Sequence, residues 1–231
     1  LKICASIAPP SQSPETLAAI LPKIRMKLKI IILSFLIFNF LNAQTKFKVE
    51  EKETETWRSI YFLVDENNKT LKVLDSAKYI HFMSGYDYGY FAICQKKGSP
   101  GWSAIDSNEK ILFQVYNTSF GEPSPDYLIE NKIRIIDAEN KIGFGNEKGE
   151  ILIKPQFEIA TSFHNGKAII GEKCKKIPWD EHAKEGDCHH YSIICENHGF
   201  INEKGKVIKL GKYKFEDISK EIDWKPDEQE Y

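Results

Sequence analysis

Residues 142–171 read IGFGNEKGEILIKPQFEIATSFHNGKAIIG. Short apolar or alternating runs stand on both sides of the tetrapeptide Asn-Glu-Lys-Gly (146–149). Such runs indicate β-strands, and an Asn followed by a Gly indicates a tight turn, because the Asn side chain accepts from nearby backbone N–H groups and Gly tolerates positive φ. The stretch predicts a β-hairpin whose return strand places alternate apolar residues on one face.

The same pattern recurs three more times, in YFLVDENNKTLKVL (61–74), WSAIDSNEKILFQV (102–115) and GFINEKGKVIKL (199–210). The four copies align on anchor residues that stand 41, 40 and 56 positions apart: Asp65, Asp106, Asn146 and Asn202. The position two before each anchor is apolar: Leu63, Ala104, Phe144 and Phe200. The position six after each anchor is also apolar: Leu71, Leu112, Leu152 and Ile208. Recurrence at a fixed period is typical of repeat architectures.

Chance is the alternative, since many all-β proteins contain similar hairpins. The match extends past the turn, however, because Phe82 and Phe163 both lie 17 positions after their anchors, and Gly85 and Gly166 both lie 20 positions after. We therefore predict an all-β fold with about four β-hairpin or meander repeats of roughly 40 residues. The repeat domain spans 59–222 and is clearest over 142–215.

These residues resemble the WG-repeat (KWG-type) family. Its unit reads roughly aromatic-Gly-aromatic-Ile-Asp, then Gly, then Ile-x-Pro-x-Tyr/Phe-Asp, then Phe-x-x-Gly-x-Ala. The third copy matches it best, at Pro155, Phe157, Phe163, Gly166 and Ala168. The fourth copy keeps Gly199, Phe200, Asn202, Gly205 and Tyr213. The Trp-Gly pair itself is degenerate, with Ile142-Gly143 and His198-Gly199 in its place and Gly101-Trp102 reversed in the second copy.

The resemblance implies a binding or structural repeat protein with no shared catalytic residues. A single unit cannot bury its own apolar face, so neighbouring hairpins are expected to stack around a shared core. An open solenoid-like array and a closed propeller-like ring both suit such units. The open form is favoured, because four units are few for a ring.

The N-terminal part has the features of a secretory leader. The first methionine is Met26, and Lys27 and Lys29 precede an apolar run that ends at Leu41, followed by small Ala43. That run of 12 residues is too short to span a membrane. We expect a signal peptide at 26–43, with cleavage near Ala43. Residues 1–25 are expected to be a non-native or untranslated leader.

The remaining 188 residues carry 27 basic and 32 acidic side chains, a net charge of −5. A mildly acidic chain argues against nucleic-acid binding, which depends on clustered Lys and Arg. No membrane span is expected in this mature part. Its first segment, 44–58, is charged and poor in apolar residues, so we interpret it as a lead-in. The acidic tail 223–231 is expected to fray.

The longest interval between anchors contains an insertion, 172–197, that is rich in Cys and His. An exported chain meets oxidising conditions, so its four cysteines are disulfide candidates: Cys94, Cys174, Cys188 and Cys195. If the strands that flank the insertion pair, Cys174 faces Cys188 or Cys195. The partner of Cys94 stays open.

A metal site is the alternative for this insertion, since thiolates and imidazoles bind zinc. The candidate ligands are Cys174, Cys188, His189, Cys195 and His198. Their spacing lacks the tight Cys-x2-Cys pair of structural zinc sites, and unpaired thiols are a further alternative.

Enzyme signatures are weak. The sequence has no Gly-x-Ser-x-Gly elbow, phosphate-binding loop or complete dinucleotide fingerprint. The aromatic cluster 85–90 offers Tyr86, Tyr88 and Tyr90 as stacking surfaces for a sugar or peptide ligand, or as caps on a core edge.

We expect an exported, non-catalytic binding or structural module of the cell envelope or extracellular space, without cofactors. Its partner is expected to be a protein or envelope component, and the chain is expected to be a monomer. The alternative is a small exported enzyme or metal-binding protein that uses 174–198.

Overall fold

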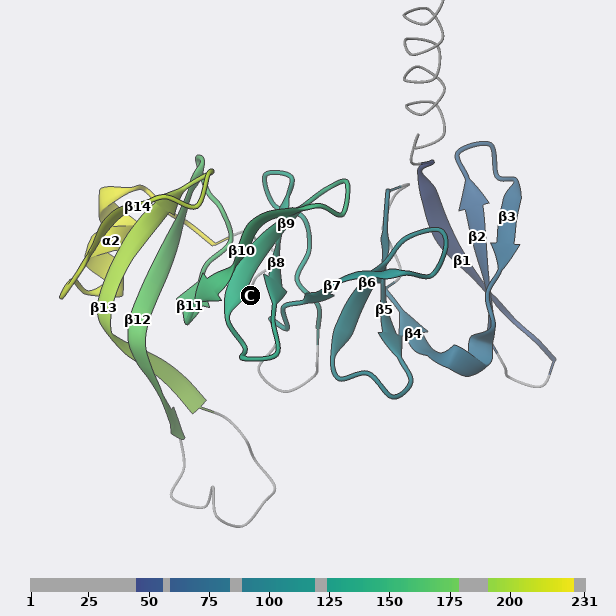
Figure 1. Ribbon diagram of the computed structural model, residues 1–231, viewed down its shortest axis with the longest axis horizontal. Coiled ribbons are helices and arrows are strands. Elements are labelled where there is room, and N and C mark those ends of the chain that lie inside the picture. Colours follow the sequence, from purple (N-terminus) through teal and green to yellow (C-terminus); the bar gives the residue numbers. More distant parts are fainter. Residues whose placement is uncertain (1–44, 56–58, 84–88, 119–123, 179–190, 227–231) are drawn as a thin grey trace, which may run out of the picture. The chain divides into compact units, whose positions relative to one another are not determined.

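The computed structural model describes residues 45–55, 59–83, 89–118, 124–178 and 191–226 (Figure 1). These residues form antiparallel strands almost throughout, which confirms the all-β prediction. Each sheet is open and has two edge strands. No helix in the described part is long and apolar enough to cross a membrane. The expected leader and signal peptide, 1–25 and 26–43, lie outside the described residues.

Within the described residues, three sheets follow one another along the chain, and neighbouring strands in a sheet are also consecutive in sequence. The three-stranded sheet consists of β1 (Phe47–Glu53), β2 (Ser59–Asp65) and β3 (Thr70–Val73). After a 3-10 turn, η1 (Ser76–Lys78), the seven-stranded sheet consists of β4 (Tyr79–Phe82), β5 (Ala92–Lys96), β6 (Trp102–Ile105), β7 (Ile111–Val115), β8 (Lys132–Ile136), β9 (Ile142–Asn146) and β10 (Ile151–Phe157). The four-stranded sheet consists of β11 (Ile159–Ala160), β12 (Lys167–Pro178), β13 (Tyr191–Asn202) and β14 (Val207–Gly211), and helix α2 (Phe215–Glu221) follows it.

The four anchor residues close four hairpins with the same turn. Each anchor side chain accepts hydrogen bonds from the backbone N–H groups two and four positions later: for Asn146, these are Lys148 and Glu150, both at 2.9 Å. The same pair of bonds occurs at Asp65, Asp106 and Asn202. The third residue after each anchor has positive φ: Asn68 (58°), Glu109 (65°), Gly149 (78°) and Gly205 (74°). The predicted turn chemistry is confirmed.

The return strands differ from the prediction, because each has a register shift six positions after its anchor, and the third has a second shift between Ile153 and Phe157. In the third copy Ile151 pairs with Gly145 and Ile153 pairs with Phe144, so Leu152 is a β-bulge. The same register shift falls six positions after the anchor in the other copies, at Leu71, Leu112 and Ile208. The bulge interrupts strict alternation. Consequently Leu71, Leu152 and Ile208 are exposed instead of contributing to an apolar inner face.

A fifth turn of the same kind was not predicted. Asp137 accepts from the N–H groups of Glu139 and Lys141 and closes the hairpin β8–β9. This hairpin has no bulge, because Ile136 pairs with Ile142 and the register continues without a shift. The bulge therefore distinguishes the four aligned copies from a hairpin that shares only their turn.

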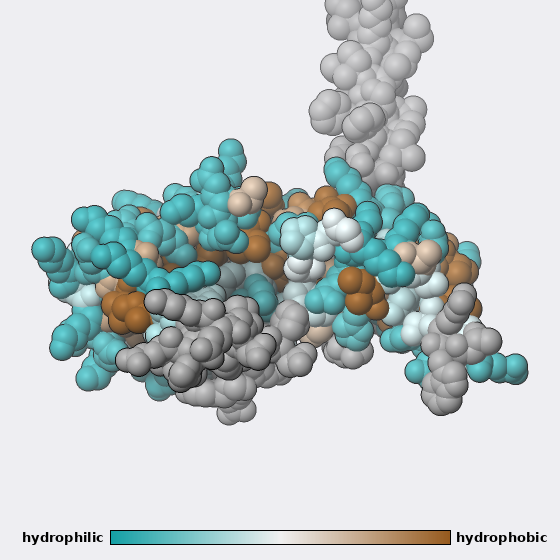
Figure 2. All heavy atoms as spheres, turned by 90° about the horizontal axis from the view of Figure 1, so that it is seen from below, coloured by the Kyte–Doolittle hydropathy of each residue, from teal (hydrophilic) through white to brown (hydrophobic). Residues whose placement is uncertain are grey.

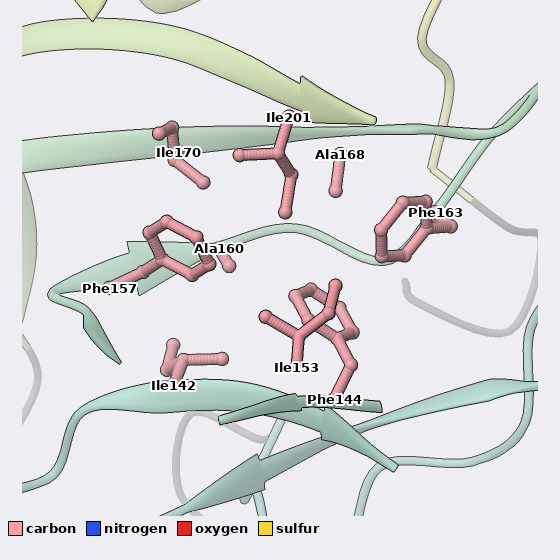
Figure 3. Packing of buried hydrophobic residues seen from close by; sticks show 9 residues of the cluster. All are labelled: Ile142, Phe144, Ile153, Phe157, Ala160, Phe163, Ala168, Ile170 and Ile201. Carbon is pink, nitrogen blue, oxygen red and sulfur yellow. The ribbon is translucent and has the colours of Figure 1, made fainter. Parts of the chain in front are cut away.

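Four clusters of buried side chains run between the strands. The residues two positions before the anchors each belong to a different cluster: Leu63, Ala104, Phe144 and Phe200. In the cluster around Phe144, side chains of β9 and β10 meet those of β11, β12 and β13 (Figure 3). The ring of Phe163 packs edge-on against Phe144 with centroids 4.7 Å apart. No copy therefore encloses its interior alone. An open, solenoid-like stacking of the copies stays a prediction.

The turn of one copy contacts the return strand of the copy before it. The carboxylate of Glu109, in the second turn, pairs with Lys72 in the first return strand. A Cβ added at Gly205, in the fourth turn, would lie 2.8 Å from Cγ2 of Ile153 in the third return strand. Gly149 approaches Leu112 in the same way. These contacts link successive copies.

Helix α2 covers the last cluster. Ile218 and Ile222 pack against Ile169 and Phe200, so the helix supplies the apolar side chains that a further copy would otherwise provide. Its Glu221 pairs at 2.6 Å with Lys209, which stands seven positions after the fourth anchor. In the same way, Glu109 pairs with Lys72, which stands seven positions after the first anchor. A capping element of this kind is typical of terminal repeats. The all-β prediction did not include this helix.

The lead-in and the acidic tail also differ from what their composition predicted. The lead-in 44–58 contains β1, which pairs with β2 along its whole length. Phe47 is fully buried and Val49 packs against the same cluster, because alternate positions of this charged strand face inward. In the acidic tail, the Trp224 Nε1 donates to the carbonyl of Ser162 at 2.9 Å, so the first part of the tail is held in place. Residues 227–231 lie outside the described residues.

Candidate functional site

The insertion 172–197 extends β12 and β13 beyond the core of their sheet as a two-stranded arm (Figure 1). We define the arm as Cys174–Pro178 paired with Tyr191–Cys195. None of its residues belongs to a buried apolar cluster. The fold does not need the arm to complete its interior, so the arm is the first place to look for a function.

A disulfide closes the base of the arm. Cys174 pairs with Cys195 directly across the two strands, and their sulfur atoms are bonded. The structure thus selects Cys195 from the two expected partners, whereas Cys188 lies outside the described residues. Cys94 has a free thiol on β5 and takes no part in this pairing. Burial raises the pKa of that thiol to about 12, so it stays protonated and inert at neutral pH.

Two residues, Gly171 and Glu158, position the base of the arm against the third copy. A Cβ added at Gly171 would lie 2.8 Å from Sγ of Cys195 and 2.7 Å from Ile159, so only glycine leaves room for the disulfide. The Glu158 carboxylate accepts from the backbone N–H of Cys174 at 2.7 Å. That bond, together with the N–H of Lys173 and the charge of Lys141, holds the pKa of Glu158 below its usual range, although burial opposes the shift.

A pocket of about 440 Å³ opens between the arm and the Asp137 turn. Its apolar wall includes Ile136, Ile159 and Ile193, and two tyrosines, Tyr116 and Tyr191, add aromatic surface. Its charged residues are Glu139, Lys141, Glu158, Lys175 and Lys176. The Lys176 ammonium lies 4.5 Å from the centre of the Tyr191 ring. This mixture of apolar wall, rings and amines suits a ligand with both apolar and polar groups.

The arm has two faces with different surroundings. Cys174, Lys176, Tyr191 and Ile193 all line the pocket. On the opposite face, Ile177 and Ile194 have exposed fractions of 46% and 56%. Elsewhere on the surface, hydrophobic residues form small separate patches among hydrophilic ones on the face shown in Figure 2. The arm thus holds Ile177 and Ile194 in solvent on one face and a partly exposed Ile193 on the pocket face, on a strand pair fixed by a disulfide.

The proposed metal ligands do not converge among the described residues. Cys174 and Cys195 are bonded to each other and offer no thiolate. Nδ1 of His198 lies 2.9 Å from the carbonyl oxygen of Tyr213, and its ring packs near Phe215. Cys188 and His189 lie outside the described residues.

The proposed stacking aromatics are only partly described. Tyr86 and Tyr88 lie outside the described residues. Tyr90 is half-buried, and the Lys46 ammonium lies 5.6 Å from its ring centre. One ring next to β1 does not form a stacking platform by itself.

Glu158 and the pocket were not predicted from the sequence. A signal was present, because Ile153-Lys154-Pro155-Gln156-Phe157-Glu158 fits the Ile-x-Pro-x-Tyr/Phe-Asp part of the repeat pattern, with Glu158 at the acidic position. The pocket could not be found in this way, since it depends on how the arm lies against the Asp137 turn.

Comparison with known proteins gives one match. Residues 142–172 match the family model described as WG containing repeat. No curated protein and no solved structure matches the chain. The family match covers the third copy, from the start of β9 to the base of the arm, and confirms the resemblance drawn from its residues.

Proposed function

We propose, from the WG-containing repeat at residues 142–172, that this chain is an exported, non-catalytic repeat protein that binds a protein or another envelope or extracellular component. The observation that carries the proposal is the arm. Ile177 and Ile194 stay in solvent on a strand pair that the disulfide and Glu158 hold in place. Exposing large apolar side chains costs solubility, and fixed apolar surface is a common feature of binding sites.

The disulfide supports the exported location, because such bonds persist outside the reducing cytosol. The same bond weighs against the alternative of an enzyme or metal protein that uses 174–198. Its two sulfurs are neither nucleophiles nor metal ligands while they are bonded to each other.

The test compares the capture of envelope or culture proteins by the wild-type chain and by Ile177→Glu/Ile194→Glu. Leu71→Glu/Val73→Glu is the matched control, because these side chains are also exposed on a β-strand. We expect the arm variant to lose partners that the wild type and the control both retain. Equal capture by all three proteins would rule out the arm as the binding surface.

The thiol state tests the alternative separately. We expect the purified protein to contain the Cys174–Cys195 disulfide by mass measurement with and without reductant. Stoichiometric zinc together with four free thiols in the mature chain would replace the binding-module proposal with the metal-site alternative.

A further inference from the structure

The last strand of the fourth copy, β14, is an edge strand of the four-stranded sheet. It pairs with β13 on one side, and no strand among the described residues pairs with its other side. An edge strand presents backbone N–H and C=O groups that only another extended chain can satisfy as a ladder.

The charge along this edge is one-sided. Residues 204–214 contain five lysines and no acidic residue: Lys204, Lys206, Lys209, Lys212 and Lys214. Within the described part of the chain, only Lys209 of these five forms an ion pair, with Glu221. The equivalent windows of the other copies are nearly neutral: 67–77 has two lysines and one acid, 108–118 has one of each, and 148–158 has two of each.

Exposed apolar side chains stand between these lysines. Val207, Ile208 and Tyr213 have exposed fractions of 42%, 52% and 42%. An apolar bulge residue is exposed in the first and third copies as well, so this feature belongs to the hairpin. The lysine run, in contrast, is particular to the window 204–214 around β14.

We propose that β14 is a docking edge for an extended acidic peptide, which adds to the four-stranded sheet as a fifth strand beside the lysines of 204–214. The unpaired backbone edge supplies main-chain hydrogen bonds, and the lysines select acidic side chains. This surface is separate from the arm, so the proposal goes beyond the proposed function.

Lys209 lies within β14 and the other four lysines flank it. Lysines along an edge also protect it against pairing with another copy. The two roles agree, because a run that repels an equally basic edge attracts an acidic strand. A nucleic acid would satisfy the lysines but would leave the backbone edge unpaired. Exposed Val207 and Ile208, next to that edge, complement a peptide better than a phosphate chain.

The experiment uses the chain with its disulfide intact and three labelled probes. These are a soluble ten-residue peptide in which Glu alternates with Val and Thr, the same peptide with Lys for Glu, and a single-stranded oligonucleotide of equal charge. Fluorescence anisotropy reports affinity, and amide hydrogen exchange reports protection of 207–211. We expect the acidic peptide alone to bind and to protect the amides of β14.

Two double variants test the contribution of charge. Lys206→Glu/Lys212→Glu should weaken the acidic peptide about tenfold at low ionic strength and should gain affinity for the basic peptide. Lys96→Glu/Lys97→Glu, on the β5–β6 hairpin, should leave both affinities unchanged. If the first variant does not fold, Lys212→Glu alone, which lies after the strand, provides the same test with a smaller change.

Three results would overturn the proposal: no binding of the acidic peptide, binding without protection of β14, or equal binding of the oligonucleotide. Loss of affinity in both double variants would also overturn it, since it would show a general charge effect. None of these results depends on whether the arm binds a partner.

Discussion

The hairpins β9–β10 and β13–β14 have the same backbone and different surroundings. Both close on an Asn that accepts two backbone N–H groups, both have Gly at positive φ three residues later, and both have a bulge six residues after the Asn. Seven residues after the Asn they diverge. Ile153 is buried in the cluster between β10 and β12, whereas Lys209 reaches Glu221 at the surface.

The difference shows that the turn and the bulge fix the backbone of the hairpin, whereas the elements packed against it determine which of its side chains are apolar. The third hairpin has a copy on either side, so its return strand must be apolar where β12 and β13 cover it. The fourth hairpin is the last among the described residues, and α2 covers its sheet. Strand β14 lies at the edge of that sheet, as β10 does in the seven-stranded sheet, but it carries no buried side chain. A terminal repeat therefore keeps the shared backbone and changes its outer residues.

Replacing the residue seven positions after the Asn by alanine should give the largest difference in stability between the two hairpins. We expect Ile153→Ala to lower the free energy of unfolding by about 3 kcal/mol, because it leaves a cavity among Phe144, Phe157 and Ile201. Lys209→Ala should change it little, since an exposed ion pair contributes little to stability. Urea unfolding followed by circular dichroism measures both. Similar losses in the two variants would show that β14 is packed as tightly as β10.

The glycines that stand at the Trp-Gly position of the family pattern give the next comparison. Gly143 and Gly199 both lie three positions before their anchors, and a Cβ at either would collide with backbone atoms of the return strand. The first two copies have a side chain at this position: Phe62, which pairs with Val73, and Ser103, which pairs with Gln114.

We expect Gly143→Ala to destabilise the protein by about 2 kcal/mol, because β10 is held by buried Ile153 and Phe157 and has no room to move. Gly199→Ala should cost about half as much, since β14 has no buried side chain that fixes its position and can shift outward. Urea unfolding measures both variants, and hydrogen exchange should show the loss of protection in β14 only for Gly199→Ala. A larger effect at Gly199 would contradict the free edge on which the docking proposal rests.

Much of what the two hairpins share could be predicted from the sequence, because it depends on residues close together in the chain. The anchors and turn glycines were identified correctly because an Asx turn and positive φ depend on residues within five positions. The position two before each anchor is apolar in every copy of the sequence, and it is buried in every copy of the structure, since alternation holds up to the turn. The bulges were not predicted, because an apolar pattern does not reveal which strand has an extra residue.

The missed elements depend on contacts that are distant in sequence. β1 is charged, and only its pairing with β2 shows that Phe47 is a core residue. The choice of Cys195 for Cys174 depends on the register of β12 against β13. Helix α2 has seven residues, too few for a helical period to stand out, and its packing through Ile218 and Ile222 against the last cluster involves residues distant in sequence.

The smallest expected effect is at the turns, where the two hairpins should behave alike. Asn146→Ala and Asn202→Ala each remove an acceptor for two exposed N–H groups that water can then satisfy, so each should cost about 1 kcal/mol. Asn202→Asp should be nearly neutral, because Asp65, Asp106 and Asp137 make the same turn with a Lys four positions later, where the fourth turn has Lys206. Asn146→Asp should cost more, because it loses the bond from Asn146 Nδ2 to the Glu150 carboxylate at 2.8 Å and brings two carboxylates together. Equilibrium unfolding in urea resolves these differences. A cost at Asn146 several times that at Asn202 would mean that neighbouring copies stabilise the turn as well as the return strand, and the shared backbone would then not be independent of its surroundings.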